Sequence, residues 1–243
     1  MPDDGRRALV TGASGGLGSA ICRALSDDGF HVIAHADSHP QKVSDLVDEL
    51  RAKGSSTETV TFDVRDGNAA EAAVLKLLKD GAIQVFVSCA GMNIDRPMAG
   101  MSAEEWHQPI DVSLNGFYNV ARPLLMPMIR TRWGRIIAIS SVSGIRGNRG
   151  QSNYAAAKAG LHGAVKSLSQ EIASKGVTVN AVAPGIIDNK AEDAGFDAAR
   201  IKAVVPMNRA GTPDEVAHTV AFLASDKAAY ISGQIIAVDG GLS

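Results

Sequence analysis

The sequence predicts an α/β fold: a doubly wound, parallel β-sheet with helices on both faces. Two observations lead to this prediction. Short runs of apolar and β-branched residues alternate with amphipathic stretches of helical spacing, which is the pattern of strands joined by crossover helices. A glycine-rich turn also joins the first of these runs to the first helical stretch, where sheets of this kind bind nucleotides.

The strand signals follow one another at intervals that leave room for a helix between them. The first run covers residues 7–10, and a helical stretch that includes residues 20–25 follows it. Later strands are expected at residues 31–35, 57–62, 85–88, 135–140, 177–182 and 234–238. The amphipathic stretch 43–50 is one of the helices between them.

Two later helices carry start signals. Ser102 with Glu105, and Thr212 with Glu215, have the spacing of a capping box. Three prolines interrupt residues 102–131, and each removes a helical hydrogen bond. We therefore expect a broken or bent helix in that stretch.

Length and composition favour one soluble domain. The chain has 243 residues, of which 45% are hydrophobic, enough to bury the core of one α/β domain. It contains no repeat, linker or low-complexity stretch, so we expect a single dinucleotide-binding domain over residues 1–243.

The charge balance excludes several classes of partner. With 24 basic and 26 acidic residues, the chain has no electrostatic footprint for nucleic acid or an anionic membrane. No stretch is long and apolar enough to span a bilayer. The two cysteines lie in apolar surroundings and lack metal-ligand spacing, so we expect a metal-free protein in a reducing, cytoplasmic compartment.

The glycine-rich turn has the features of a phosphate-binding loop. It follows a strand and opens a helix, so free backbone N–H groups and the positive end of the helix dipole face a bound anion. A strand before the turn and a helix after it are typical of a Rossmann-type sheet. They favour a turn that binds a ligand over a glycine turn without one. The expected cofactor contacts in the turn are Gly12, Ser14, Gly15, Gly16, Leu17 and Gly18.

A second motif supplies acid–base groups. Tyr154 and Lys158 lie one turn apart on one face of an expected helix, and an ammonium beside the phenol is expected to lower the tyrosine pKa. Ser141 follows the buried strand 135–140 and can hold the group that Tyr154 protonates. By itself, this spacing favours a half-buried tyrosine and a solvated lysine without a catalytic role, and the glycine turn decides for the catalytic interpretation.

With these two motifs, the chain resembles the short-chain dehydrogenases/reductases over nearly its whole length. Within that family, residues 140–158 and 179–185 are most similar to the 3-oxoacyl-[acyl-carrier-protein] reductases. Residues 117–120, 126–129 and 147–151 are similar to the branch found in aryl-polyene biosynthetic clusters.

The resemblance implies a catalytic role for each of three residues. Ser141 holds a substrate carbonyl oxygen, and Tyr154 protonates it. Lys158 binds the nicotinamide ribose and lowers the tyrosine pKa. Tyr154 and Lys158 thus also count as cofactor contacts.

It also implies cofactor contacts after the later strands. They are Asp63 and Val64 at the adenine, Ala90 and Gly91 at the adenosine ribose, and Pro184, Gly185 and Ile187 near the nicotinamide. For Asp63, a carboxylate that caps a turn is an equally good interpretation.

The chain departs from the family pattern at several positions. Ser113 stands where the family commonly has an asparagine that links the lysine to solvent, so we expect a proton relay that is weakened or carried by an extra water, while the chemistry survives. Asn115, two residues on, is expected to point to the opposite side of the helix. Asn189 replaces a common threonine and can still bond a carboxamide.

The preference between cofactors is left open by these departures. The family resemblance implies NADPH, whereas Gly15, in place of a basic residue, and the carboxylate of Asp37 favour NADH. Ser38 and His39 remain available for a 2′-phosphate. We keep NADPH ahead, with NADH as the alternative.

The resemblance implies the reduction of a 3-oxoacyl thioester carried by an acyl carrier protein. Arg132 and Lys175 fall where related reductases contact that partner, although single cations at helix ends are more often solvated. The family also implies a mobile lid over residues 188–200 and a homotetramer or dimer. A dehydrogenase that acts on a free alcohol, ketone or sugar and a non-catalytic nucleotide-binding subunit remain as alternatives.

Overall fold

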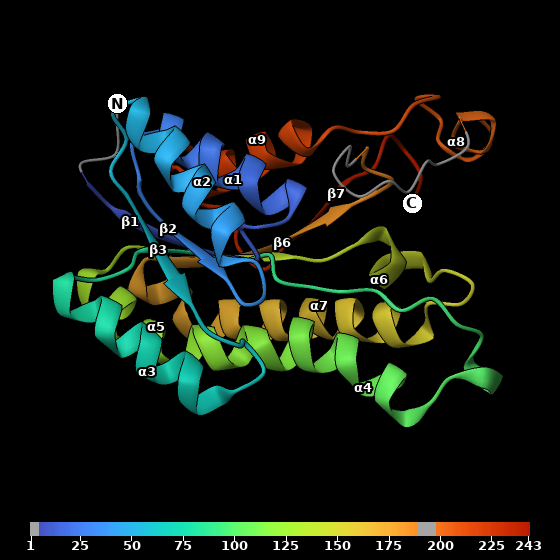
Figure 1. Cartoon of the computed structure of the whole chain (residues 1–243), viewed down its shortest axis with the longest axis horizontal. Coiled ribbons are helices and arrows are strands. Elements are labelled where there is room, and N and C mark those ends of the chain that lie inside the picture. The colour runs from blue at the N-terminus through green and yellow to red at the C-terminus, as the bar shows by residue number, and fades with distance from the viewer. Residues whose placement is uncertain (1–4, 189–197) are drawn as a thin grey trace.

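Seven parallel strands form one sheet in the computed structural model, which describes residues 5–188 and 198–243 (Figure 1). The strand order is β3-β2-β1-β4-β5-β6-β7. The strands are β1 (Arg7–Thr11), β2 (His31–Ala36), β3 (Thr57–Thr61), β4 (Val85–Ser88), β5 (Gly134–Ile139), β6 (Val177–Pro184) and β7 (Ile235–Val238). The order reverses between β1 and β4, and in such sheets a ligand lies outside the carboxyl ends at this point.

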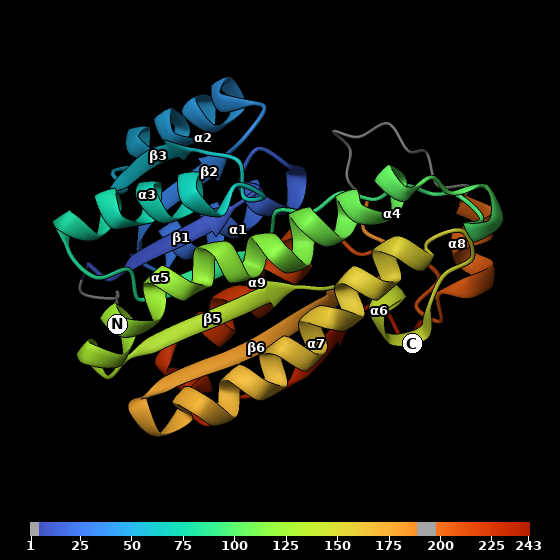
Figure 2. The ribbon, with the colours of Figure 1, turned by 90° about the horizontal axis from the view of Figure 1, so that it is seen from below.

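Helices cover both faces of the sheet (Figure 1). The α-helices are α1 (Gly16–Asp27), α2 (Pro40–Ala52), α3 (Gly67–Leu77), α4 (Ala103–Ile110), α5 (Gly116–Thr131), α6 (Val142–Arg146), α7 (Ser152–Ile172), α8 (Ala198–Val204) and α9 (Pro213–Ala224). The shorter segments are η1 (Leu78–Asp80), η2 (Met98–Gly100), η3 (Asp111–Asn115), η4 (Ala173–Lys175) and η5 (Asp226–Ala228). Figure 2 shows α5 and α7 side by side on one face, while α1, α2 and α9 lie on the other.

Alternating side chains of β1 pack into two separate hydrophobic cores. Ala8 and Val10 pack with α1, α2 and α9, whereas Leu9 packs with α3, α5 and α7. Successive residues of a strand point to opposite faces, so a strand buried on both sides is apolar throughout. This explains why the strands are continuous apolar runs in the sequence.

The structure confirms the predicted order of elements. The strands lie where the sequence predicts them, with ends that differ by one or two residues. Both capping boxes are formed: the Ser102 hydroxyl accepts from the Glu105 N–H, and the Thr212 hydroxyl accepts from the Glu215 N–H.

The proline-rich stretch is broken as expected. Pro109 lies near the end of α4, and the next five residues, Asp111–Asn115, are π-helical before α5 continues. Pro123 and Pro127 lie inside α5.

In residues 5–188 and 198–243, no helix is long and apolar enough to cross a bilayer. The expected lid over 188–200 lies largely outside the described residues, which omit 189–197. Its last residues belong to α8.

Candidate functional site

A cavity of about 480 Å³ opens at the carboxyl ends of β1, β4, β5 and β6. It brings together segments that lie far apart in the sequence. Its lining consists of Gly12, Ser14, Gly15, Gly16, Leu17, Gly18, His39, Lys42, Cys89, Ala90, Gly91, Met92, Asn93, Ile139, Ser140, Ser141, Tyr154, Lys158, Pro184 and Gly185.

The turn from β1 to α1 forms one wall of this cavity. Gly12 has a φ of +69°, and a Cβ there would lie 2.8 Å from the Ala90 Cα. A Cβ on Gly18 would collide with the Gly12 carbonyl. A side chain is therefore excluded at both positions. A Cβ on Gly15, in contrast, would have only the Gly12 carbonyl oxygen within 4 Å, so the Gly15 backbone is open towards the cavity.

This wall fits the pyrophosphate of a dinucleotide. Helix α1 begins at Gly16, and its first N–H groups lie beside the open turn. Helix N-termini bind phosphate through such N–H groups and the helix dipole.

The threonine before the turn joins β1 to β4. The Thr11 hydroxyl accepts hydrogen bonds from the N–H of Cys89, at 3.1 Å, and of Ala90, at 3.2 Å. These contacts hold the end of β4 beside the glycine turn.

The structure distinguishes two neighbouring serines. The hydroxyl of Ser140 is buried, donates to the Lys158 carbonyl at 3.1 Å and lies 2.7 Å from His162 Nε2. Ser141 is half-buried, caps α6 by accepting from the Ser143 N–H at 3.1 Å, and shares the cavity with Tyr154. Ser140 is thus held by α7, and this favours Ser141 as the residue that meets a substrate.

Lys158 is buried in the wall of the cavity, with 3% of its surface exposed. Its ammonium donates to the Ile139 carbonyl at 2.8 Å and lies 5.5 Å from the centre of the Tyr154 ring. Burial lowers the pKa of Lys158 to about 8. The amine is then still mostly charged at neutral pH.

The expected lowering of the Tyr154 pKa is wrong. Burial raises the pKa of Tyr154 above its ordinary value, and a side-chain hydrogen bond with Ser141 only partly opposes this effect. Helical spacing puts Lys158 on the same face, but the ammonium is directed to the Ile139 carbonyl. The phenol therefore stays protonated, which is the form that a proton donor needs.

Ser113 lies in the π-helical segment and is 1% exposed. Its hydroxyl has no hydrogen-bond partner among the described residues. A methyl group on Gly91 would lie 3.4 Å from the Ser113 oxygen and 3.1 Å from Lys158 Nζ, so both polar atoms adjoin Gly91. Asn115 is exposed and donates to Asp111, in agreement with the prediction that it points elsewhere.

Four of the expected cofactor contacts are not in the cavity lining. Asp37 is exposed, and the Asp63 carboxylate accepts from the backbone and side chain of Arg65, as in the turn-capping interpretation. Val64 is buried against Gly116, and Ile187 forms a bridge with Gly211. Asn189, expected near the carboxamide, is outside the described residues.

Arg132 and Lys175 lie together but far from the cavity. The Arg132 guanidinium donates to the Ser174 carbonyl, next to Lys175. They precede β5 and β6, so they lie at the amino ends of these strands. A six-residue strand, about 20 Å long, separates them from the cavity end of the sheet.

Sequence reasoning missed one cation of the cavity. Lys42 lies in the first turn of α2 and lines the cavity with His39. The signal in the sequence was a lysine two residues after Pro40, in a helix that starts at the nucleotide end of β2. Among residues 5–188 and 198–243, no three His, Cys, Asp or Glu side chains gather as a metal site.

Comparisons with known proteins agree with this geometry. A family model described as enoyl-(acyl carrier protein) reductase matches residues 12–243. The 3-oxoacyl-[acyl-carrier-protein] reductase FabG of Aggregatibacter actinomycetemcomitans is 42% identical over 236 residues, 96% of this chain and 98% of the relative. FabG of Staphylococcus aureus is 40% identical over 240 residues, 98% of each chain, and nodulation protein G of Azospirillum brasilense is 41% identical over 239 residues, 97% of each chain.

The chain is a short-chain dehydrogenase/reductase. Short-chain dehydrogenases/reductases are oxidoreductases that use a nicotinamide dinucleotide to interconvert CH–OH and C=O groups, so the chain is an enzyme of this kind. The family assignment thus decides against a non-catalytic nucleotide-binding subunit.

Because the Lys158 ammonium is buried, we expect its removal to increase stability and to abolish activity. Lys158→Met removes a charge whose lowered pKa corresponds to a cost of about 3 kcal/mol and also removes one hydrogen bond, worth about 1 kcal/mol. We expect the free energy of unfolding of the cofactor-free protein to rise by about 1–3 kcal/mol at pH 7, while activity is lost. Urea unfolding measures the first effect.

The size of this effect depends on pH. The folded pKa of Lys158 lies below its unfolded value, so the cost is fully present below about pH 8 and disappears as pH rises through the ordinary lysine pKa. A Lys158→Met variant that is less stable than the wild type at pH 7 contradicts the prediction.

The position of Ser113 beside Lys158 predicts how an asparagine at residue 113 would change turnover. Ser113→Asn adds two donors beside Lys158 and should raise turnover roughly 2–10-fold, measured as kcat at saturating substrate. Asn115→Ser is the control, because Asn115 is exposed and bonded to Asp111. Turnover that stays the same or falls in the Ser113→Asn variant argues against a weakened relay.

Proposed function

We propose that the chain reduces a 3-oxoacyl thioester to the 3-hydroxyacyl thioester with NAD(P)H, as one domain over residues 1–243. The observation that carries this proposal is the meeting of Ser141, Tyr154 and Lys158 in the same cavity as the glycine turn. The 40–42% identity with proteins named 3-oxoacyl-[acyl-carrier-protein] reductase supports the substrate class.

Each of the three side chains has a distinct task. The dinucleotide supplies the hydride to the carbonyl carbon. Ser141 donates a hydrogen bond to the carbonyl oxygen and fixes its position, and Tyr154 gives that oxygen its phenolic proton. Lys158 would hold ribose hydroxyls, and its ammonium, 5.5 Å from the centre of the Tyr154 ring, places a positive charge in the wall of the cavity.

We propose NADPH as the cofactor, with NADH as the alternative. Lys42 and His39 line the cavity beside the glycine turn, at the end of β2 where the adenosine ribose is bound in sheets of this kind. A lysine ammonium binds phosphate as a point charge. Asp37, the residue that favours NADH, is exposed and is absent from the lining.

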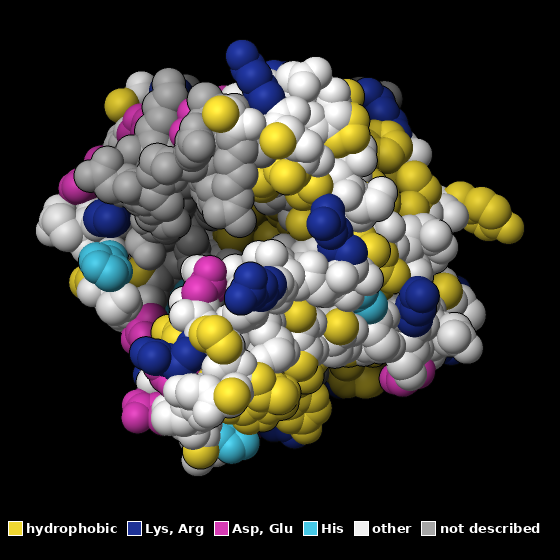
Figure 3. All heavy atoms as spheres, turned by 90° about the vertical axis from the view of Figure 1, so that its right-hand side faces the viewer, with side chains coloured by type: hydrophobic (Ala, Val, Ile, Leu, Met, Phe, Trp, Pro, Cys, Tyr) yellow, Lys and Arg dark blue, Asp and Glu magenta, His cyan; other side chains and the backbone are white. Residues whose placement is uncertain are grey.

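We propose an acyl carrier protein as the bearer of the substrate, in line with the names of the relatives. Lys and Arg side chains are spread among hydrophobic ones on the end of the molecule seen in Figure 3. The candidate contacts Arg132 and Lys175, however, belong to the amino ends of their strands. A carrier held there has to deliver its acyl chain to the cavity of a second copy.

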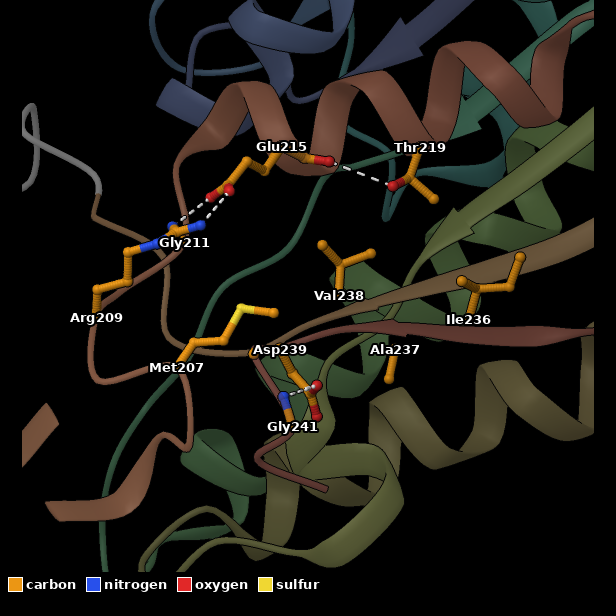
Figure 4. Close-up of a pocket in the computed structure, with 11 residues that line it drawn as sticks. Met207, Arg209, Gly211, Glu215, Thr219, Ile236, Ala237, Val238, Asp239 and Gly241 are labelled. Carbon is orange, nitrogen blue, oxygen red and sulfur yellow. Dashed lines mark hydrogen bonds and ion pairs between the residues drawn. The ribbon is translucent and has the colours of Figure 1, made fainter. Parts of the chain in front are cut away.

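We also propose a homotetramer or dimer, located in the cytoplasm. Strand β7 is the edge of the sheet, and its side chains are only partly covered. Ile236 and Val238 face a cavity of about 440 Å³ between β7, α9 and the segment that carries Met207 (Figure 4). An apolar sheet edge of this kind favours pairing with a second copy.

Helix α7 supports the same proposal only in part. Of the small residues on this helix, Ala157 is buried and Gly160 packs against Leu114 of its own chain. Ala156 is exposed, and Gly163 has open space around it. The outer face of α7 therefore offers two small residues, Ala156 and Gly163, for a helix contact.

An activity matrix tests the proposed reaction. Acetoacetyl thioesters on a carrier protein, on coenzyme A and on N-acetylcysteamine should each oxidise NADPH, whereas free ketones, sugars and a crotonyl thioester should react poorly, and free alcohols should reduce NADP⁺ poorly. Tyr154→Phe should lower kcat/KM by roughly 10²–10⁴. Tyr118→Phe, on the exposed face of α5, is the matched control. Cofactor oxidation at the wild-type rate by the Tyr154→Phe variant rules out the assigned proton donor.

Charge removal at α2 tests the choice of cofactor. Lys42→Gln should raise the Kd of NADPH about tenfold and leave the Kd of NADH within twofold, because only NADPH carries the 2′-phosphate. Lys53→Gln makes the same charge change at the other end of α2 and should affect neither. If instead Asp37→Ser weakens NADH and Lys42→Gln leaves NADPH unchanged, NADH is the cofactor.

A further inference from the structure

His35, on β2, lies beneath the glycine turn and is 1% exposed. Its Nε2 is 2.8 Å from the Phe62 carbonyl oxygen, and its Nδ1 accepts from the Gly12 N–H at 3.3 Å. The His35 carbonyl also accepts from the Ala13 N–H at 2.8 Å. Side chain and backbone of His35 thus both hold the start of the turn.

These contacts fix the protonation of the ring. The Phe62 carbonyl can only accept, so Nε2 carries the proton, and the Gly12 N–H can only donate, so Nδ1 is bare. The ring also packs against Phe62, with 4.1 Å between ring centres. His35 therefore has one allowed tautomer and one allowed orientation.

A second proton would break this arrangement. On Nδ1 it would face the Gly12 N–H, and two donors cannot bond to each other. The charged groups that influence the ring are Asp37, next on the chain after β2, and Asp63, after β3, which is paired with Arg65. Burial lowers the pKa of His35 in spite of the two carboxylates, so the ring is neutral at neutral pH.

The Gly12 amide lies at a point where the turn is held from two sides. Gly12 lies against Ala90, so the turn is confined between β2 on one side and the end of β4 on the other. Moving the Gly12 N–H by losing its acceptor would shift the peptides that follow, which form the wall of the cofactor cavity.

We propose that His35 is a positioning residue for the dinucleotide: its bare Nδ1 holds the Gly12 amide and sets the phosphate-binding turn, and acid weakens cofactor binding by protonating this nitrogen. The proposal depends on dinucleotide binding, which the family establishes, and is independent of the acyl substrate.

Three substitutions separate the two hydrogen bonds of the ring. In His35→Asn the amide oxygen matches Nδ1 and keeps an acceptor for Gly12, whereas the longer amide in His35→Gln reaches towards Phe62 as Nε2 does. His35→Leu keeps neither bond. The Kd of NADH is measured by fluorescence titration without acyl substrate, so a failure of the proposed reaction does not affect the result.

At pH 7.5 the His35→Leu and His35→Gln variants should bind NADH about tenfold more weakly than the wild type, and the His35→Asn variant within about threefold of it. The value of kcat at saturating cofactor should stay within about twofold in all three. Thermal unfolding of each cofactor-free variant shows whether it is folded.

The pH dependence provides a second readout that a structural role alone does not produce. As the pH falls below 6.5, the ordinary histidine pKa, the Kd of NADH should rise for the wild type and stay flat for the His35→Asn variant, because an amide does not titrate. His218→Gln, which removes an exposed histidine of α9, should retain the wild-type pH dependence.

Two outcomes overturn the proposal: wild-type affinity in a folded His35→Leu variant, or a wild-type pH profile in the His35→Asn variant. If His35→Leu does not fold, the pH profile of His35→Asn alone decides.

Discussion

The Lys158 ammonium lies almost fully buried at the end of β5, where it donates to the Ile139 carbonyl. A charge in such a place costs free energy unless it is paired, and its lowered pKa expresses that cost. At this position the amine lies in the wall of the cavity, 5.5 Å from the centre of the Tyr154 ring. The neighbouring groups follow from it: Ser140 ties α7 to the strand end, and Tyr154 and Ser141 share the space in front of the amine.

The opposite wall of the cavity depends on backbone contacts rather than on charge. The glycine turn is held from three strands: by the His35 ring and carbonyl on β2, by Thr11 to the end of β4, and through His35 to the carbonyl that follows β3. Such a turn keeps its N–H groups directed at a ligand before the ligand arrives, which reduces the entropy lost on binding. One wall of the cavity is thus built from hydrogen-bonded backbone, and the other carries the side chains of Ser141, Tyr154 and Lys158.

Much of this could be predicted from the sequence because the signals are local. The period of apolar residues defines a strand or a helix, a capping box defines a helix start, and a glycine turn between strand and helix defines a phosphate loop. The Tyr154–Lys158 spacing also puts both residues on one helix face. Local spacing gave the wrong direction for the shift of the Tyr154 pKa. The direction of the flexible Lys158 side chain and the burial of the phenol depend on segments that are distant in sequence. Lys42 was missed for the same reason: its helix is brought to the glycine turn only by the folded sheet.

The sequence by itself determined the order of strands and helices, the doubly wound sheet, and the residue types that carry the chemistry. The tertiary structure decided which of two adjacent serines is held by α7, where Arg132 and Lys175 lie relative to the cavity, and which tautomer His35 adopts. The physical reason is the range of the interactions. Periodicity and capping act over a few residues, whereas burial, hydrogen-bond partners and the end of the sheet at which a side chain lies depend on strands that pair across the whole chain.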